Sequence, residues 1–187
     1  RFLVDTGMGL GAIALRHLKS AEAPQLWAEL AAAHTGADRW YLEALGIGAE
    51  KQWDACLDAW LAKVGSQWNT PGGHEIIWRS RSSKTPTLLA QIISDPRVSL
   101  GELPRYFRAF DYQSGPAKDA ALVELAFAPQ DSDADRAKLV STESLRRLPQ
   151  LDVDKNPQHA AALERLLGQM RGTSQFVELV GRFNLSK

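Results

Sequence analysis

The chain has 187 residues, of which 44% are hydrophobic, and this is enough to build the core of an ordinary domain. Its 22 lysines and arginines balance 22 aspartates and glutamates, whereas a protein that grips a phosphate backbone normally carries a basic excess. We therefore expect no nucleic acid partner. Because no apolar run approaches the ~18–20 residues needed to cross a bilayer, we also expect no membrane insertion.

The cysteine content limits the cofactors that this chain can hold. Cys56 is the single cysteine, and no C-x-x-C-H motif is present. Covalent c-type haem and a cysteine-rich zinc site are thereby excluded on this chain. The chain begins with Arg1 rather than methionine and shows no signal-peptide pattern, so we expect it to be a fragment of a larger multidomain protein.

Residues 1–23 are expected to form an irregular N-terminal segment. Gly7, Gly9 and Gly11 interrupt its apolar residues, and their spacing does not match the G-x-G-x-x-G dinucleotide fingerprint. Glycine lowers helix propensity, so a loop followed by a short helix over 12–19 is the prediction.

Three helices are predicted next. Pro24 opens the first, Gly36 ends it, and Asp38 caps the second. The third, over 53–64, carries a continuous apolar stripe at helical spacing. The stripe consists of Trp53, Cys56, Leu57, Trp60, Leu61 and Val64. Cys56 is therefore predicted to be a buried small hydrophobic residue rather than a reactive thiol.

Later helix starts share one pattern, a capping residue placed before a proline at the first helical position. These starts are Thr70-Pro71, Thr85-Pro86 and Asn156-Pro157, with Ser114-Gly115-Pro116 as a looser version. Ser99 and Glu102 have the spacing of a capping box. Further helices are predicted over 117–128, 134–148 and 158–170, and after Thr173. No stretch alternates with a period of two, so the predicted fold is all-α.

A degenerate repeat runs through these helices. R-W-Y-L-E-A-L at 39–45, I-I-W-R-S-R at 76–81 and P-R-Y-F-R-A-F at 104–110 each combine aromatic residues with arginine, and each precedes a second apolar helix. One helix pair cannot bury its own apolar face, so such pairs stack. We predict a HEAT-like α/α superhelix, a solenoid of antiparallel helix pairs that spans 1–187 as a single domain.

Three segments carry a family resemblance. They read D-R-W-Y-L-E-A-L-G-I-G-A, W-N-T-P-G-G-H-E-I-I-W-R-S-R-S-S-K-T-P and L-P-R-Y-F-R-A-F-D-Y-Q-S-G-P. The sequence resembles the HEAT-repeat-like helical region of large secreted bacterial proteins that combine a propeller similar to membrane-bound sugar dehydrogenases with a c-type cytochrome segment. The match covers 25–128 well and the rest loosely.

The resemblance implies a periplasmic or secreted location and a connecting role between redox-type modules. The full-length parent would then be a haem-containing dehydrogenase. This chain departs from that pattern, because it lacks both C-x-x-C-H and propeller-like β segments. Haem binding and dehydrogenase activity are carried over to no residue here, and we expect no cofactor on this chain.

Two acidic clusters approach a calcium-loop pattern without completing it. Asp131, Asp133 and Asp135 fit the first positions, but Arg136 stands where glycine makes the turn and Thr142 where glutamate closes the shell. An acidic helix start, favoured by the helix dipole, is the prediction for this segment.

Other catalytic and metal-binding patterns are also incomplete. Asp152, Asp154 and Asn156 fail as a calcium loop, because proline follows them at the glycine position. His74-Glu75 begins the H-E-x-x-H zinc motif, but Trp78 replaces its second histidine. No G-x-S-x-G nucleophile motif is present. We therefore expect neither a metal site nor catalysis.

Tryptophan and arginine enrichment is the remaining signal. All six tryptophans lie between Trp27 and Trp78, and tryptophan, tyrosine and arginine are the residue types favoured at binding hot spots. The candidate partner-binding residues are Trp40, Trp68, Trp78, Arg79, Arg81, Arg105, Arg108 and Asp111. In the alternative interpretation these arginines stack on indoles between repeats, and Asp111 pairs with Arg108.

The leading hypothesis is a non-catalytic scaffold or protein-interaction domain, with flanking domains of the same polypeptide or another protein as its partner. A carbohydrate-binding module that uses Trp40, Trp68 and Trp78 as stacking platforms is the alternative from another class. The third hypothesis is an enzyme site completed by domains outside this chain.

Overall fold

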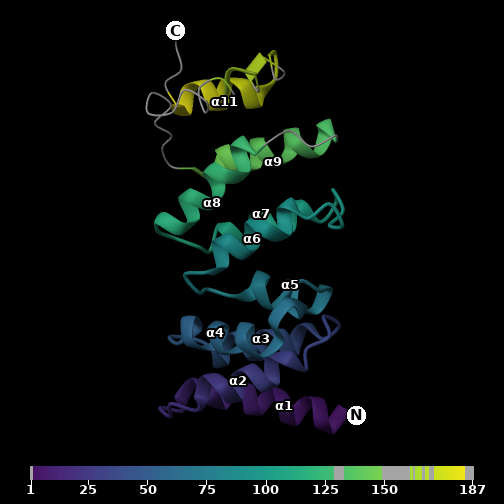
Figure 1. The fold of residues 1–187 in the computed structure, drawn as a ribbon, viewed down its shortest axis with the longest axis vertical. Helices are drawn as coiled ribbons and strands as arrows, with labels where there is room; N and C mark the ends of the chain where they lie inside the picture. Colours follow the sequence, from purple (N-terminus) through teal and green to yellow (C-terminus); the bar gives the residue numbers. More distant parts are fainter. Residues whose placement is uncertain are drawn as a thin grey trace. The chain divides into compact units, whose positions relative to one another are not determined.

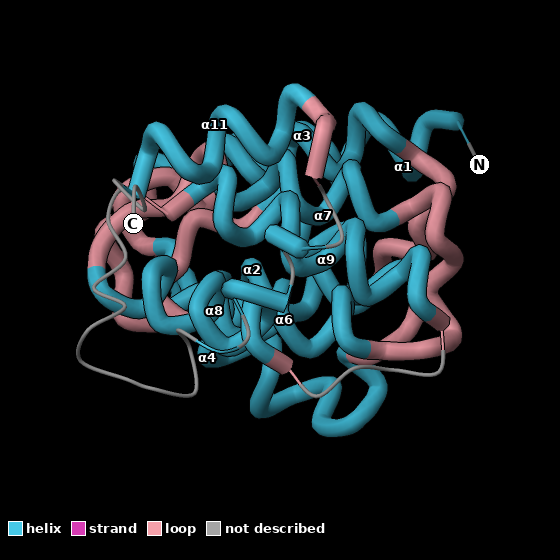
Figure 2. The backbone as a smooth tube through the Cα atoms, turned by 90° about the horizontal axis from the view of Figure 1, so that it is seen from above, coloured by secondary structure: helices cyan, strands magenta, loops and turns pink. Residues whose placement is uncertain are grey.

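The computed structural model describes residues 2–128, 133–148, 161, 163–165, 167–168 and 171–183. Within that part every regular element is a helix, which confirms the all-α prediction (Figure 2). The chain forms two compact units, Arg1–Ile92 and Ile93–Lys187, where the sequence predicts a single domain. The boundary between the two units falls inside helix α6 (Thr85–Ser94).

The first unit is built of helices packed in layers. Its elements are α1 (Phe2–Ala14), η1 (Leu15–His17), α2 (Ala23–Ala32), α3 (Arg39–Gly48), α4 (Trp53–Val64), η2 (Gly65–Trp68) and α5 (Pro71–Arg79), followed by the start of α6. Helices α1 and α2 form one layer and α3 and α4 the next (Figure 1). Helix α1 packs on α3 and α2 packs on α4, so the corresponding helices of successive pairs are in contact.

The prediction of an irregular segment over 1–23 is wrong for most of its length. Residues Phe2–Ala14 form α1 despite the glycines. The reason is tertiary: a Cβ atom at Gly48 of α3 would overlap the carbonyl oxygen of Ala12, so the absence of a side chain there lets the two helices approach closely. Packing of this kind outweighs the ~1 kcal/mol of helix propensity that each glycine costs relative to alanine.

The predicted stripe on α4 forms the inner side of that helix. Cys56, Leu57 and Trp60 are buried, and the remaining stripe residues are half-buried. On α2, the buried Trp27 donates its indole N–H to the carbonyl of Leu45 at 2.9 Å. The predicted register of α4 and the buried state of Cys56 are therefore confirmed.

Three of the predicted helix caps are present. Each has a side-chain oxygen accepting a backbone N–H three residues later, the usual N-cap geometry. The pairs are Asp38 with Tyr41 (3.0 Å), Thr70 with Gly73 (3.3 Å) and Thr173 with Phe176 (3.2 Å). Thr85 differs: it is the first residue of α6, and its hydroxyl donates to Ser80 Oγ at 2.8 Å. The predicted start at Asn156-Pro157 lies outside the described residues.

The second unit contains the remaining described helices. They are α7 (Leu103–Phe110), α8 (Pro116–Phe127), α9 (Ala134–Arg147) and α11 (Ser174–Phe183), preceded by the end of α6. Helix α9 packs on α8 and also contacts α7. Phe107 and Phe110 of α7 are fully buried.

Arg136, near the start of α9, connects two parts of this unit. Its guanidinium is buried and donates to the carbonyls of Ile93 (2.6 Å), Val98 (2.6 Å) and Asp95 (2.8 Å). Asp133 caps the same helix by accepting the Arg136 N–H at 3.0 Å. The predicted acidic helix start is confirmed at Asp133, while Asp131 lies outside the described residues.

Candidate functional site

Two of the predicted partner-binding residues, Trp78 and Arg79 on α5, are engaged with α3. Glu43 accepts from Arg39 at 2.8 Å and from Arg79 at 2.8 Å. The Arg39 guanidinium carbon lies 4.8 Å from the centroid of the Trp78 ring, within cation–π distance. These four residues, together with Gly46, are called the α3–α5 cluster.

Gly46 makes room for this cluster. A Cβ atom at Gly46 would lie 2.6 Å from Arg79 Nε, so the guanidinium occupies the space that a side chain would take. Burial raises the pKa of Glu43, but the hydrogen bonds and charges of Arg79 and Arg39 outweigh that effect and hold the pKa below its usual value. The cluster therefore contains an ionised carboxylate between two arginines, and it holds α5 against α3.

Arg81 caps the end of α5. Its Nη1 donates to the carbonyls of Ser80 (2.7 Å) and Arg79 (2.9 Å), which lie at the C-terminus of that helix. Cations in this position compensate unpaired carbonyls and the helix dipole. Arg79 and Arg81 thus have structural roles in the first unit, Arg79 through an ion pair and Arg81 at a helix C-terminus. The indole stacking of the alternative interpretation is seen for Arg39, which is not one of the candidates.

The serines after Arg81 attach the following turn to α4. Asp54 accepts from Ser82 Oγ (2.7 Å), from the Ser83 N–H (2.7 Å) and from Ser83 Oγ (2.9 Å). These hydrogen bonds, with the Ser82 hydroxyl first, lower the pKa of Asp54.

The three candidate tryptophans differ in exposure. Trp40 of α3 is 84% exposed, whereas Trp68 and Trp78 are half-buried. The Arg39 guanidinium also lies over the Trp78 ring. A stacking platform for sugar rings needs accessible indole faces, and Trp40 has the most accessible indole of the three.

The candidates on α7 belong to the second unit. Arg108 is exposed, and Arg105 lies with its guanidinium carbon 6.0 Å from the Tyr106 ring centroid. Asp111 pairs with Arg147 of α9 at 2.9 Å rather than with Arg108. A single surface joining Arg105 and Arg108 to the arginines of the first unit stays a prediction.

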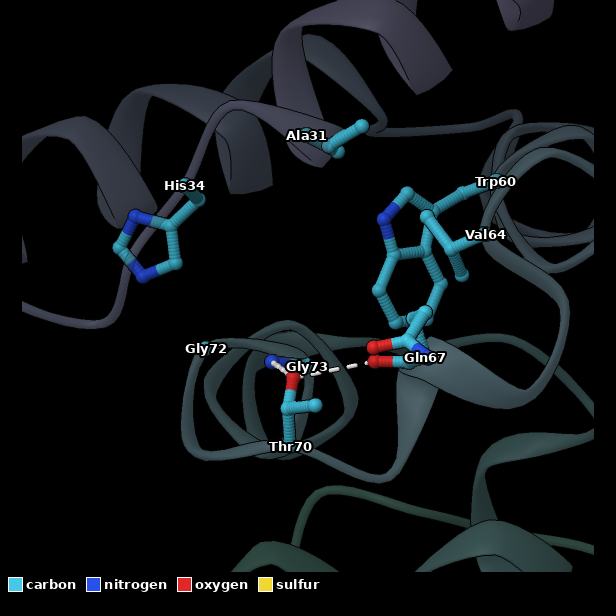
Figure 3. A pocket seen from close by; sticks show the side chains of 9 residues that line it. Ala31, His34, Trp60, Val64, Gln67, Thr70, Gly72 and Gly73 are labelled. Atoms are coloured by element: carbon cyan, nitrogen blue, oxygen red, sulfur yellow. Dashed lines mark hydrogen bonds between the residues drawn. The ribbon is translucent and has the colours of Figure 1, made fainter.

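A pocket that sequence reasoning missed lies in the first unit. It has a volume of about 150 Å³ and forms where α2, α4, η2 and the start of α5 meet (Figure 3). Its lining residues are Ala31, Ala32, His34, Trp60, Val64, Gln67, Thr70, Gly72 and Gly73. We call it the His34–Trp60 pocket.

Adjacent glycines shape one wall of this pocket. A Cβ atom at Gly72 would lie 2.8 Å from the carbonyl oxygen of His34, and one at Gly73 would overlap the carbonyl oxygen of Trp68. The start of α5 therefore lies against the backbone of two other segments. The dipeptide directly after Pro71 is the signal by which the sequence could have indicated this close approach.

Two buried polar atoms among the lining residues have no hydrogen-bond partner. They are Nε2 of His34 and Nε1 of Trp60, whose residues are 8% and 2% exposed. Thr70, by contrast, is satisfied, because its hydroxyl donates to the Gln67 carbonyl at 3.0 Å and accepts the Gly73 N–H at 3.3 Å.

The surroundings of His34 favour its neutral form. Burial lowers its pKa below the usual value, while the charges of Glu75 and Asp38 act in the opposite direction with smaller effect. A neutral imidazole nitrogen donates or accepts a hydrogen bond according to its tautomer. Neither His34 Nε2 nor the indole nitrogen of Trp60 is accessible from the pocket, since both atoms have almost no accessible surface.

Within the described residues, no group of three or more histidines, cysteines, aspartates or glutamates is placed to hold a metal ion. The described helices also include none that is long and apolar enough to cross a bilayer. No protein family, curated protein or solved structure matches this chain. The resemblance to the helical region of secreted dehydrogenase–cytochrome proteins therefore stays a prediction.

Proposed function

We propose that this chain is a non-catalytic helical-repeat scaffold of the HEAT-like type, which binds a protein partner or positions neighbouring modules. The observation that carries the proposal is the packing of corresponding helices in successive pairs, α1 on α3 and α2 on α4. Stacking of this kind is how helix pairs that cannot bury their own apolar faces become stable. The α3–α5 cluster supports the same stacking for the next helix pair, because it holds α5 against α3.

A rigid array of helices suits a binding role. Side chains fixed on a packed helix lose little conformational freedom when a partner binds, so less of the binding free energy is spent on ordering them. Trp40 lies in the first turn of such a helix. Its side chain is 84% exposed, and the Asp38 cap and the Arg39–Glu43 ion pair stabilise the start of α3. We propose Trp40 as the main contact residue of the first unit.

The partner in this proposal is a protein module, either a flanking domain of the same polypeptide or a separate protein. The resemblance favours redox-type modules in a periplasmic or secreted setting. The carbohydrate-binding alternative is weaker, because Trp68 and Trp78 are half-buried and Arg39 covers the Trp78 ring. An enzyme site completed by other domains remains a separate hypothesis.

The test is site-specific photo-crosslinking in the cells that produce the protein. A benzophenone amino acid replaces Trp40 in one sample and Gln25, an exposed residue of α2, in the control. We expect a discrete protein adduct from the Trp40 position and none from the Gln25 position. Absence of an adduct at Trp40, or the same adducts from both positions, would overturn the proposed contact.

A further inference from the structure

We propose that the outer face of α1 binds a second copy of this chain, with the two α1 helices packed antiparallel about a twofold axis near Leu10 and Gly11. The outer face consists of the exposed residues Gly7, Leu10, Gly11, Ile13 and Ala14. This inference goes beyond the scaffold role and does not use the Trp40 contact. It rests on the exposed apolar side chains of this face and on its continuity with the stacking on the other side of α1.

The first step is the position of α1 in the first unit. Helices α1 and α2 form the end layer of that unit, and α1 packs on α3 of the next layer (Figure 1). A Cβ atom on Gly9 would lie 3.9 Å from that of Ala44 on α3. No neighbouring element lies within 4 Å of one on Gly7 or Gly11, which the helical spacing places on the opposite side of α1. One side of α1 is therefore stacked, and the opposite side is open.

The second step is the chemistry of the open side. Leu10 is 64% exposed, Ile13 is also exposed, and no residue of the outer face is charged. Asp5 is the single charged residue of α1. The end pair of a helical stack normally has a polar outer face, because that surface meets water. A helix that is apolar all round is normally buried on both sides. The outer face therefore has the character of one more stacking interface.

The third step is the shape of the outer face, which fits a second copy of itself. A twofold interface uses the same patch on both subunits, so the patch must supply both the protruding and the receding parts. Leu10 protrudes beside the small residues Gly7, Gly11 and Ala14 at helical spacing. In an antiparallel pair, Leu10 of each copy would lie against the small residues of the other. The contact with α3 already shows close packing of this kind, at Gly48.

The fourth step is charge, which favours an antiparallel second copy. The chain has no net charge, so two copies do not repel each other as whole molecules. Arg16 and Lys19 follow α1, and Asp5 lies near its start. A parallel pair would place the two basic ends side by side. An antiparallel pair places the basic end of each copy level with the acidic position of the other, where opposite charges attract.

The experiment is sedimentation velocity of the full chain over a range of concentrations. One helix face is smaller than a standard interface, so we expect weak association, with one chain per particle near about 5 µM and two near about 500 µM. Leu10→Glu places charges in the interface and should weaken association by at least about tenfold. Val177→Glu on α11 is the matched control, because Val177 is 69% exposed, and it should leave association unchanged. Circular dichroism checks that both variants fold.

A second variant distinguishes close helix packing from general apolar adhesion. Gly11→Leu makes the outer face more apolar but fills the space that the second helix needs. It should therefore weaken association, whereas stronger association would overturn the antiparallel packing. A chain that remains single at every concentration, or a Leu10→Glu variant that associates like the parent, would overturn the proposal.

Cysteine cross-linking tests the position of the twofold axis. Gly11→Cys should give a disulfide-linked pair of chains when diamide oxidises the two thiols, because the axis passes close to this residue. Gly101→Cys, at an exposed and open position of the second unit, is the control and should give little of this product. The native Cys56 is buried and does not compete. Equal cross-linking of both variants would overturn the proposed axis. Flotation of a non-associating chain with phosphatidylcholine vesicles would assign the face to a lipid surface and overturn the second copy.

Discussion

The Cys56 thiol is enclosed within the apolar side of α4. It is fully buried, and this burial raises its pKa to about 12. Since the thiolate is the reactive form, the folded protein should react negligibly with iodoacetamide at pH 8. Mass spectrometry should show full modification only after denaturation in guanidinium. Modification of the folded protein at the rate of a free thiol would contradict the buried position.

His34 couples the stability of the first unit to pH. Burial lowers its pKa in the folded state below the value near 6.5 of the unfolded chain, despite the opposing charges of Glu75 and Asp38. Below about pH 6.5 the unfolded state therefore binds more protons, and the free energy of unfolding falls as the pH is lowered toward the folded-state pKa.

This pH dependence is measurable by urea unfolding between pH 8 and pH 5. The His34→Gln variant keeps a polar side chain without a titrating ring and should show a shallower loss of stability over the same range. Equal slopes for the two proteins would mean that His34 is protonated equally in its folded and unfolded states.

Trp60 and Trp40 form a matched pair at opposite extremes of burial. Trp60 is 2% exposed and Trp40 is 84% exposed. Trp60→Ala should lower the free energy of unfolding by about 3–5 kcal/mol through lost burial and a cavity. Trp40→Ala should change it by less than about 0.5 kcal/mol. Denaturant unfolding measures both, and a loss below about 1 kcal/mol for Trp60→Ala would contradict its place in the core.

At the scale of elements, alanine substitutions of the glycines in α1 and α3 should change the free energy of unfolding for two different reasons. One reason is helix propensity, and the other is the close contact between the two helices. Nothing lies within 4 Å of a Cβ atom built on Gly11 of α1, whereas one on Gly48 of α3 would overlap the backbone of Ala12. Gly11→Ala should therefore raise the free energy of unfolding by about 0.5–1 kcal/mol. Gly48→Ala should lower it, because α1 must move away from α3.

Gly46→Ala should have an effect on stability between those of Gly11→Ala and Gly48→Ala. Its Cβ would meet the guanidinium of Arg79, a flexible side chain that can turn aside. The gain in helix propensity should then offset most of the lost ion pair with Glu43. Thermal melting of the three variants should rank Gly11→Ala highest and Gly48→Ala lowest. An equal or higher melting temperature for Gly48→Ala than for Gly11→Ala would contradict the close α1–α3 contact.

The features that the sequence predicted correctly are those encoded within one or two helical turns. The Asp38 and Thr70 caps and the α4 stripe depend on residues three or four apart, and local chemistry determines them. The α1 helix was missed because its stability comes from a contact with α3, far along the chain. Propensity alone does not contain that information.

The clusters and the pocket depend on residues that are distant in sequence. The Arg79–Glu43 ion pair joins positions 36 residues apart, and Arg136 reaches the carbonyl of Ile93 across 43 residues. The sequence indicated that arginine and tryptophan were enriched, but not which arginine would meet which ring. His34 and Trp60 gave no separate signal, because a histidine after an apolar helix and a tryptophan within a stripe both have ordinary structural explanations.

At the scale of the whole molecule, the division into two units falls between Ile92 and Ile93, inside α6. A helix cut in the middle loses hydrogen bonds on both sides of the cut, because each N–H bonds to a carbonyl four residues earlier. Loss of structure in either unit should therefore destabilise the half of α6 that belongs to the other. We expect the two units to unfold in a single cooperative transition.

All six tryptophans lie before residue 79, within the first unit, so indole fluorescence observes that unit alone. Far-UV circular dichroism observes the helices of both units. Recorded on one sample in a guanidinium titration, the two signals should give superimposable curves if unfolding is cooperative across the boundary. A helical signal that persists after the fluorescence change is complete would show that residues beyond Ile92 fold independently. The uneven distribution of an aromatic residue thus gives the protein an intrinsic optical label, and cooperativity can be measured without attaching a dye.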